Sequence, residues 1–125
     1  MAAVLEGELS TLGAPIADCA YRRMSWPLTP DLFRGLAGAD LAAAAIPDEA
    51  DYLARYLRRT GRPRPQCWEF CLVLAMFRIA SIMQGMARRS LDGTASNSDA
   101  AEVGAKAGPI SEIAVERARA WERWG

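Results

Sequence analysis

The sequence contains no histidine and only one lysine, Lys106. A soft metal site would therefore have to be built from cysteine, of which there are only three. Basic and acidic residues balance at 15 each, so the formal net charge is zero. Nucleic-acid-binding domains usually carry a strong positive field, which is missing here. We therefore expect no nucleic-acid partner.

The three cysteines, Cys19, Cys67 and Cys71, do not form the even set that is typical of a disulfide framework. Cys67 and Cys71 are four residues apart, so on a helix they would share a face and could supply half of a soft metal site. Because no histidine and only one further cysteine could complete it, we favour three reduced cysteines in the core and no metal bound by them.

Long hydrophobic runs are also missing. The longest apolar run extends from Phe70 to Phe77 and ends at Arg78. It is far shorter than the ~20 residues that a helix needs to span a bilayer. The N-terminus has no basic region followed by an apolar stretch, so we expect no signal peptide. These features predict a cytoplasmic protein without a membrane partner.

What is present is a sizeable apolar content. Hydrophobic residues make up 51% of the chain and charged residues 24%, which predicts one folded domain over residues 1–125. The spacing of apolar residues is mostly helical, so the predicted fold class is all-α, with allowance for one short N-terminal strand at Ala2–Leu5. The predicted helices run from Pro15 to Met24, from Thr29 to Leu36, from Asp48 to Gly61, from about Gln66 to Leu91, and from about Asp99 onward with a break or kink at Pro109.

The long helix is predicted to be buried on most sides, because its first half is apolar nearly all round. Two polar residues, Arg78 and Gln84, interrupt that apolar surface. A lone arginine in such a helix needs a partner. We favour a structural ion pair with a core acid such as Asp18 and keep open a ligand cleft. Glu69 lies in the first turn, where it either faces a pocket or interacts with the helix dipole.

Two charge clusters remain. The arginines Arg55, Arg58, Arg59, Arg62 and Arg64 could form an anion or nucleic-acid patch, but no aromatic residue interleaves with them, and we favour a solvated helix face. Glu6 and Glu8 follow the predicted strand and, in an extended chain, point the same way. Paired carboxylates of this kind suit a hard divalent cation such as Mg²⁺.

Three segments together resemble the aminoglycoside/choline-kinase-like phosphotransferase family. AVLEGELSTLGAPIADCAY is similar to a family segment that usually reads valine-leucine-aspartate-tryptophan-glutamate, followed by a leucine-glycine-proline turn and an aspartate-bearing helix. The resemblance continues through GLAGADLAAAAIPDEADYLARYLRRTGRP and is strongest in WEFCLVLAMFRIASIMQGMARRSLDGTASNSDAAEVG. That last segment is similar to the subgroup associated with acyl-CoA dehydrogenases.

The resemblance implies a protein-kinase-like enzyme that transfers the γ-phosphoryl group of ATP to a small-molecule hydroxyl, with Mg²⁺ neutralising phosphate charge. It implies further that this chain is the C-terminal helical part, which shapes the acceptor pocket, for which Glu69, Arg78 and Gln84 are our candidates. The family's metal-binding aspartate corresponds to Glu6, its tryptophan to Gly7 and its glutamate to Glu8. ATP and Mg²⁺ are the cofactors of a complete family member.

The chain departs from the family pattern in two ways. Glu6 replaces the aspartate, which moves the carboxylate by roughly an ångström although Mg²⁺ demands near-ideal octahedral geometry. The ATP-binding lobe, its lysine and the His-Gly-Asp catalytic loop should all lie upstream of this chain. We therefore expect a gene fragment, a split reading frame or a truncated form that has no catalytic residues and no cofactor when alone.

Other hypotheses stay open. The second is a non-catalytic helical module that binds a small ligand or another chain. The third is an arginine-rich protein associated with nucleic acid. The predicted strand Ala2–Leu5 would have lost its neighbour, and the surface toward the missing lobe should be partly apolar. A homodimer could cover both, so we expect the chain to self-associate.

Overall fold

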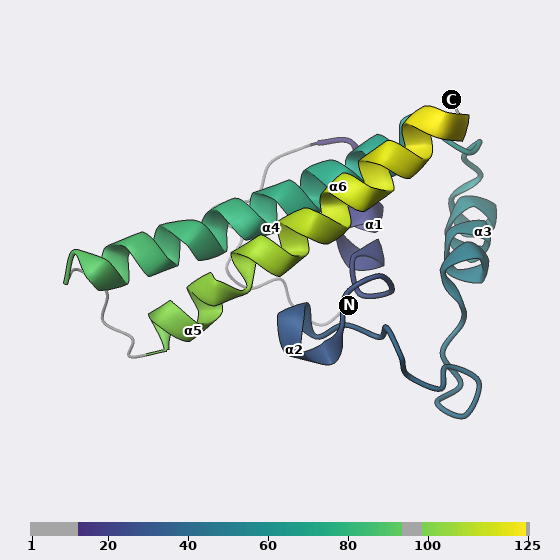
Figure 1. Cartoon of the computed structure of the whole chain (residues 1–125). Helices are drawn as coiled ribbons and strands as arrows, with labels where there is room; N and C mark the ends of the chain where they lie inside the picture. Colours follow the sequence, from purple (N-terminus) through teal and green to yellow (C-terminus); the bar gives the residue numbers. More distant parts are fainter. Residues whose placement is uncertain (1–12, 94–98, 125) are drawn as a thin grey trace, which may run out of the picture.

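The computed structural model describes residues 13–93 and 99–124, with the backbone alone for residues 122–124 (Figure 1). This part of the chain contains helices and no strand, as the prediction of an all-α fold requires. The predicted strand Ala2–Leu5 lies outside the described residues. The helices are α1 (Pro15–Arg23), α2 (Pro30–Phe33), α3 (Glu49–Thr60), α4 (Trp68–Leu91), α5 (Ala100–Ala105) and α6 (Ala107–Trp124).

Helix boundaries follow the local sequence closely. Pro15 occupies the first position of α1, where its missing N–H costs nothing. Asp48 caps α3 by accepting a hydrogen bond from the backbone N–H of Asp51 at 2.8 Å. Gly61 ends α3 with a φ of 64°, a left-handed conformation that favours glycine. The predicted ends of α3, at Asp48 and Gly61, are therefore confirmed.

Helix α2 is shorter than predicted. It ends at Phe33, because Arg34 adopts a left-handed conformation with a φ of 47°. The next residue, Gly35, lies so close to the backbone of Leu28 that a Cβ atom there would overlap the Leu28 carbonyl group. This close approach stops the helix and turns the chain away.

The predicted break near Pro109 occurs at Lys106, between α5 and α6. In a continuous α-helix, the ring of Pro109 would clash with the carbonyl group four residues earlier, which belongs to Ala105. Helix α5 ends at that residue, and a new helix begins at Ala107 with Pro109 in its first turn. The position of the break therefore follows directly from the covalent structure of proline.

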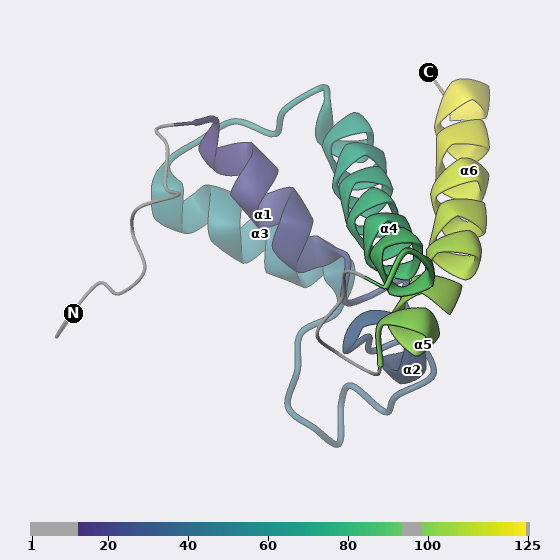
Figure 2. The ribbon, with the colours of Figure 1, turned by 90° about the vertical axis from the view of Figure 1, so that its left-hand side faces the viewer.

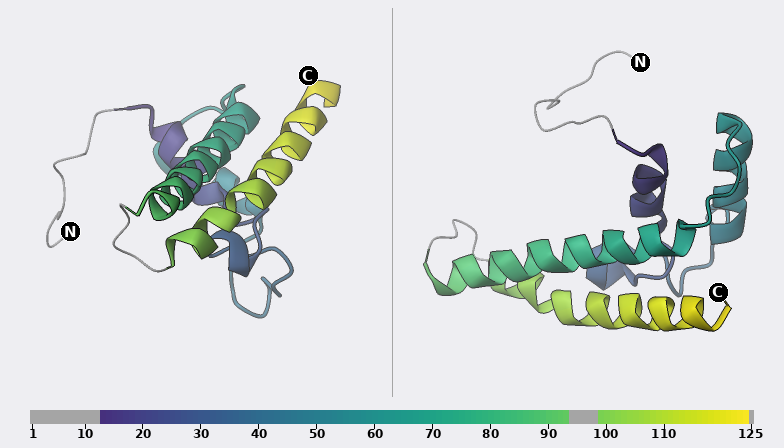
Figure 3. Two further views of the ribbon diagram at one scale, coloured as in Figure 1. Left: turned by 60° about the vertical axis from the view of Figure 1, so that its left-hand side comes forward. Right: turned by 90° about the horizontal axis from the view of Figure 1, so that it is seen from above.

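The main core lies between α4 and the returning helices α5 and α6. Figures 1 and 3 show α4 and α6 running side by side in opposite directions, with the end of α6 beside the beginning of α4. Five side chains are almost completely inaccessible and fill this core: Met24, Leu28, Leu72, Met76 and Ile110. At Gly104, α5 approaches α4 so closely that a Cβ atom would overlap the side chain of Ala87.

A second, smaller cluster joins α1, α3 and the beginning of α4 (Figure 2). Cys19 and Ala20 of α1 pack there with Leu53 of α3 and Trp68 of α4, all of them buried. Tyr52, Tyr56 and Leu57 are half-buried around them, so α3 packs against the cluster through one apolar face. This cluster places the first turns of α3 and α4 next to the last turn of α1.

The prediction that α4 is buried on most sides is wrong. Phe70, Leu74, Phe77 and Ile82 are exposed, and Phe77 retains 63% of its accessible surface. Three of these residues, Phe70, Leu74 and Phe77, recur at intervals of four and three and so share one face of the helix. The sequence pattern was correct about apolarity, but α1, α5 and α6 cover only the opposite face.

Helix α4 is also long and apolar enough to cross a membrane, judged by length and composition alone. Core helices of globular proteins pass the same test. Here Leu72, Met76, Ile79 and Met83 of α4 form the core with α6, although only 33% of its most apolar stretch is buried.

Candidate functional site

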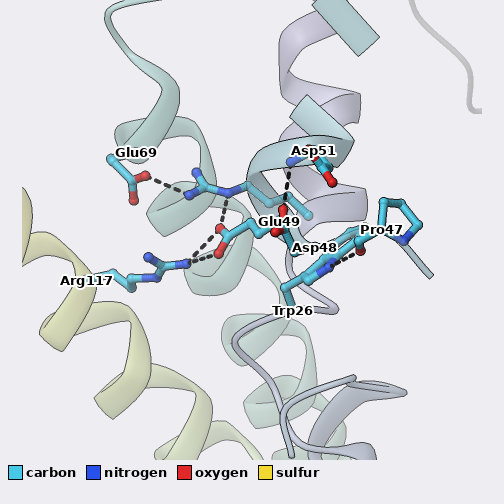
Figure 4. A network of polar contacts seen from close by, with 8 residues as sticks. Trp26, Pro47, Asp48, Glu49, Asp51, Glu69 and Arg117 are labelled. Atoms are coloured by element: carbon cyan, nitrogen blue, oxygen red, sulfur yellow. Dashed lines mark hydrogen bonds and ion pairs between the residues drawn. The ribbon is translucent and has the colours of Figure 1, made fainter. Parts of the chain in front are cut away.

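A buried arginine, Arg23, is the centre of the strongest polar network in the described structure. It lies in the last turn of α1 and retains only 5% of its accessible surface. Its Nε donates a short hydrogen bond to the carboxylate of Glu49, and its Nη2 donates to Glu69 at 2.7 Å. Figure 4 shows the two carboxylates, on α3 and α4, on the same guanidinium group. Arg23 thus links three helices.

A fourth helix joins through Arg117 of α6. Its Nη2 donates to both oxygens of Glu49, at 2.7 and 2.9 Å (Figure 4). On its other side, the Arg23 guanidinium lies 4.8 Å from the ring centroid of Trp68, within the range of a cation–π interaction. Two arginines and two carboxylates therefore neutralise one another where the four helices meet.

The positions of these residues along their helices favour the network. Glu49 and Glu69 lie in the first turns of α3 and α4, where the helix dipole favours negative charge, and Arg23 lies in the last turn of α1, where it favours positive charge. A further hydrogen bond from Trp26 Nε1 to the carbonyl oxygen of Pro47, at 3.0 Å, fixes the chain just before α3. Arg23, Glu49 and Glu69 are thus each stabilised by their own helix as well as by their partners.

A cavity of about 470 Å³ lies beside this network. Its apolar wall comes from one side of α3 and from Trp68, and its charged lining comes from Arg23, Glu49, Asp48 and Arg64. The Nη1 atom of Arg23 is buried and has no acceptor among the described residues. A buried donor without a partner is costly to the fold. The apolar lining residues are Ala50, Leu53, Ala54, Leu57 and Trp68.

The residues predicted to form an acceptor pocket are not brought together. Glu69 lies in the Arg23 network. Arg78 lines a separate hollow of about 210 Å³ against α1, and Gln84 lines a third one, of about 370 Å³, against α6. No described cavity contains two of the three. A role of Glu69, Arg78 or Gln84 in binding the acceptor stays a prediction.

The predicted buried pair of Arg78 with Asp18 is not found. Both side chains are exposed, and neither has an ion-pair partner among the described residues. The two residues do line the same hollow. The expectation failed because α4 turns the face that carries Arg78 toward solvent, where an unpaired arginine costs little.

The cysteines are free, as predicted, but only one is in the core. Burial raises the pKa of the Cys19 thiol, although a hydrogen bond with Tyr52 and the charge of Arg23 act in the opposite direction. Cys67 is exposed, which contradicts the expected core position, and its sulfur lies 3.8 Å from that of Cys71. No group of three or more metal-ligating side chains occurs in residues 13–93 and 99–124.

The other sequence-predicted charges fall into two groups. The five arginines from Arg55 to Arg64 are all exposed, as expected for solvated charges, but only the first three lie on α3 and the other two follow its end. The proposed metal ligands Glu6 and Glu8 lie outside the described residues.

The sequence interpretation missed Arg23, Glu49 and Arg117 as members of one site. None of the three stands out locally, because charged residues are common on helix faces that contact solvent. Arg23 and Glu49 are 26 positions apart in the sequence, and Glu49 and Arg117 are 68 apart, so only the tertiary fold shows that they meet. A usable signal was the pairing of two helix-starting glutamates, Glu49 and Glu69, with a helix-ending arginine.

Comparison with known proteins gives matches over most of the chain. No protein-family model matches it. Acyl-CoA dehydrogenase family member 10 of Mus musculus is 37% identical over 114 residues, which cover 90% of this chain and 11% of that protein. Acyl-CoA dehydrogenase family member 11 of Rattus norvegicus is 33% identical over 121 residues, which cover 94% of this chain and 15% of that protein. The chain thus spans a small part of the curated relatives.

A solved structure is similar as well. The crystal structure of a Ralstonia eutropha protein, described as a candidate aminoglycoside phosphotransferase, superposes with a TM-score of 0.85 and is 51% identical in sequence. The match covers 94% of this chain and 36% of that one. The similarity therefore extends to nearly every residue here, but to about a third of the Ralstonia protein.

Proposed function

We propose that this chain is the acceptor-binding part of an ATP-dependent small-molecule O-phosphotransferase. It corresponds in sequence and fold to the C-terminal helical part of an aminoglycoside-phosphotransferase-like protein, in the subgroup associated with acyl-CoA dehydrogenases. The observation that carries this proposal is the match to the Ralstonia structure, at 51% identity over 94% of the chain. At that level of identity both the fold and the arrangement of its helices are expected to be shared.

In enzymes of this kind, catalysis depends mainly on positioning the acceptor hydroxyl and on neutralising phosphate charge. The described helices offer cavities and a rigid charged network, but no nucleophile, base and metal ligand held together. We propose that the residues which bind ATP come from outside these 125 residues. Glu6 would be this chain's contribution to the Mg²⁺ site, and the other ligands of the metal would also come from outside. The acceptor is a small molecule with a free hydroxyl group.

The test of this division is ATP turnover by the purified chain. We expect no steady-state release of ADP above that of a Glu6→Ala control, with or without added alcohols, in a coupled spectrophotometric assay. Turnover that exceeds the control would contradict the proposal, because the chain would then contain a complete catalytic site of its own.

A second proposal concerns a partner, and it is that the chain forms a homodimer. The apolar face of α4, made up of Phe70, Leu74 and Phe77, supports it, since large exposed apolar patches usually mark an interaction site. Two copies that pair through this face would cover it symmetrically. A stable interface typically buries about 800 Å² on each partner.

Light scattering coupled to gel filtration tests the dimer. We expect a dimer mass at micromolar concentration and a monomer mass for Phe77→Glu, because the new charge would be buried in the interface. Val115→Glu is the matched control, since Val115 is also an exposed apolar residue but lies on α6. A monomer mass for the unmodified chain would contradict the proposal.

A further inference from the structure

Two of the three cysteines, Cys67 and Cys71, lie next to each other at the beginning of α4. Cys67 is the N-cap residue of this helix, and Cys71 follows one turn later, so both lie on the same side of the first turn. Their sulfur atoms are 3.8 Å apart, and the thiol of Cys71 donates a hydrogen bond to the sulfur of Cys67. This distance leaves no room for another heavy atom between the two sulfurs.

The two thiols differ in their surroundings. Cys67 is exposed and Cys71 is half-buried, whereas Cys19 is buried between α1, α3 and α4. Burial raises the pKa of the Cys71 thiol, and the hydrogen bond with Cys67 and the charge of Cys67 act in the same direction. Cys67 also lies at the N-terminal end of α4, where the helix dipole favours negative charge. Cys67 is therefore placed to react first, as a thiolate, and Cys71 second.

A bond between the two sulfurs requires only a local movement. The Cβ atoms of a disulfide are about 3.5–4.5 Å apart, whereas those of residues four apart on a helix are about 5–6 Å apart, so the first turn must tighten by roughly 1–2 Å. Cys67 can supply this movement because it precedes the helix, to which its carbonyl oxygen is joined by a hydrogen bond from the N–H of Cys71 at 2.9 Å. A disulfide under such strain is easily reduced again, as is typical of regulatory disulfides.

We infer that Cys67 and Cys71 form a reversible dithiol–disulfide pair, which a low-molecular-weight disulfide such as glutathione disulfide oxidises. The Cys67 thiolate attacks one sulfur of glutathione disulfide, so a mixed disulfide forms and one glutathione thiolate leaves. Cys71 then loses its proton and attacks the Cys67 sulfur, which forms the internal disulfide and releases the second glutathione. Two protein thiols are thus oxidised, and one glutathione disulfide is reduced to two glutathione molecules. This reactivity does not depend on the proposed phosphotransferase activity.

The residues enclosed by the pair connect it to the polar network. Trp68 and Glu69 lie between the two cysteines in the sequence. Glu69 accepts a hydrogen bond from Arg23 at 2.7 Å, and the Arg23 guanidinium lies 4.8 Å from the ring centroid of Trp68. Tightening of the first turn moves both residues relative to Arg23. Oxidation of the pair therefore acts on the contacts that join α1 to α4.

The experiment exposes the folded, fully reduced chain to glutathione disulfide near neutral pH, traps free thiols with iodoacetamide and maps them by peptide mass spectrometry. We expect one peptide that contains Cys67 and Cys71, is two hydrogens lighter and carries no alkyl group. Reduced glutathione should restore both thiols. Cys19→Ala should behave in the same way, because Cys19 is buried away from the pair.

Single variants separate the two steps. Cys71→Ser should stop at the mixed disulfide of glutathione with Cys67. Cys67→Ser should react about tenfold more slowly than Cys71→Ser, because the remaining thiol is less exposed and less acidic. In ¹H–¹⁵N NMR of the Cys19→Ala chain, oxidation should move the indole signal of Trp68 and leave the amide of Leu91, at the other end of α4, unchanged.

Three results would overturn the inference. The first is a mixed disulfide on Cys67 of the unmodified chain that persists without forming the internal bond. The second is disulfides between chains in place of the internal one. The third is equal reactivity of Cys67→Ser and Cys71→Ser. An internal disulfide that leaves the Trp68 indole signal in place would refute its connection to the Arg23 network.

Discussion

The substitution Glu49→Gln tests most sharply whether the Arg23 network stabilises the fold. Glutamine has nearly the same shape and keeps one oxygen acceptor, so the change removes mainly the negative charge. Arg23 would then keep Glu69 as its one charged partner among the described residues, while its guanidinium stays buried. Arg117 would lose its ion pair at the same time.

The size of the effect follows from burial. Breaking a fully buried ion pair typically costs about 3–5 kcal/mol, because the remaining charge stays buried. The Glu49 side chain is 26% exposed, and glutamine still accepts a hydrogen bond, so we expect the free energy of unfolding to fall by about 2 kcal/mol. For a chain of this length that corresponds to a decrease in Tm of roughly 6–10 °C.

Urea denaturation measures this effect, with tryptophan fluorescence and circular dichroism as probes. Glu112→Gln is the matched control, because Glu112 is exposed on α6 and has no ion pair among the described residues, so a change within about 0.5 kcal/mol is expected. Arg117→Met should cost less than Glu49→Gln, about 1 kcal/mol, since Arg117 is 29% exposed and Arg23 still pairs with Glu49. If Glu49→Gln is no more destabilising than Glu112→Gln, the network does not hold the helices together.

Three other predictions concern separate parts of the chain. Gly104→Ala should lower the free energy of unfolding by about 1–2 kcal/mol in urea denaturation, because the new methyl group would overlap Ala87, whereas Gly108→Ala has open space and should be neutral or stabilising. The free energy of unfolding should fall as pH rises above about 9, because burial raises the pKa of Cys19. The folded state then keeps a proton on this thiol that the unfolded state releases. A decline of equal size in Cys19→Ala would contradict this cause. Calorimetry should detect no sub-millimolar Mg²⁺ binding that disappears in Glu6→Gln, because Mg²⁺ in such sites usually depends on substrate phosphate oxygens as well.

Helix positions could be predicted from this sequence because their determinants are local. Pro15, the Asp48 cap and Gly61 act within a few residues of the helix ends that they set. The steric limits of Pro109 likewise act within one turn, and the break at Lys106 follows from them. Such features need no knowledge of the tertiary fold.

Burial of α4 could not be predicted in the same way. Its apolar residues occur on every side, and periodicity cannot tell which side its neighbours cover. Arg78 therefore looked like a buried charge, although the structure places it in solvent. Arg23, by contrast, lies in an ordinary polar stretch beside Arg22, and only tertiary contacts make it the buried arginine of the described structure.

The candidate site shows the same division. Glu69 was singled out from the sequence, and it does belong to the polar network, but through an arginine that the sequence did not indicate. Residues 46 positions apart meet there because α1 and α4 cross, and no local pattern encodes that crossing. The family resemblance, in contrast, depends on whole segments, and it is confirmed by the similar solved structure.

The central claim is that these helices bind the acceptor of a phosphotransferase. The most direct measurement is transfer of the γ-phosphoryl group of ATP to an alcohol by a chimera in which this chain replaces the matching 36% of the Ralstonia protein. The account predicts that the folded chimera phosphorylates at least one alcohol from a panel of small hydroxyl compounds, detected by mass spectrometry, and that this chain alone phosphorylates none. Two results would contradict the account. One is a folded chimera that binds ATP but phosphorylates no alcohol that the Ralstonia protein accepts. The other is phosphorylation of an alcohol by this chain alone.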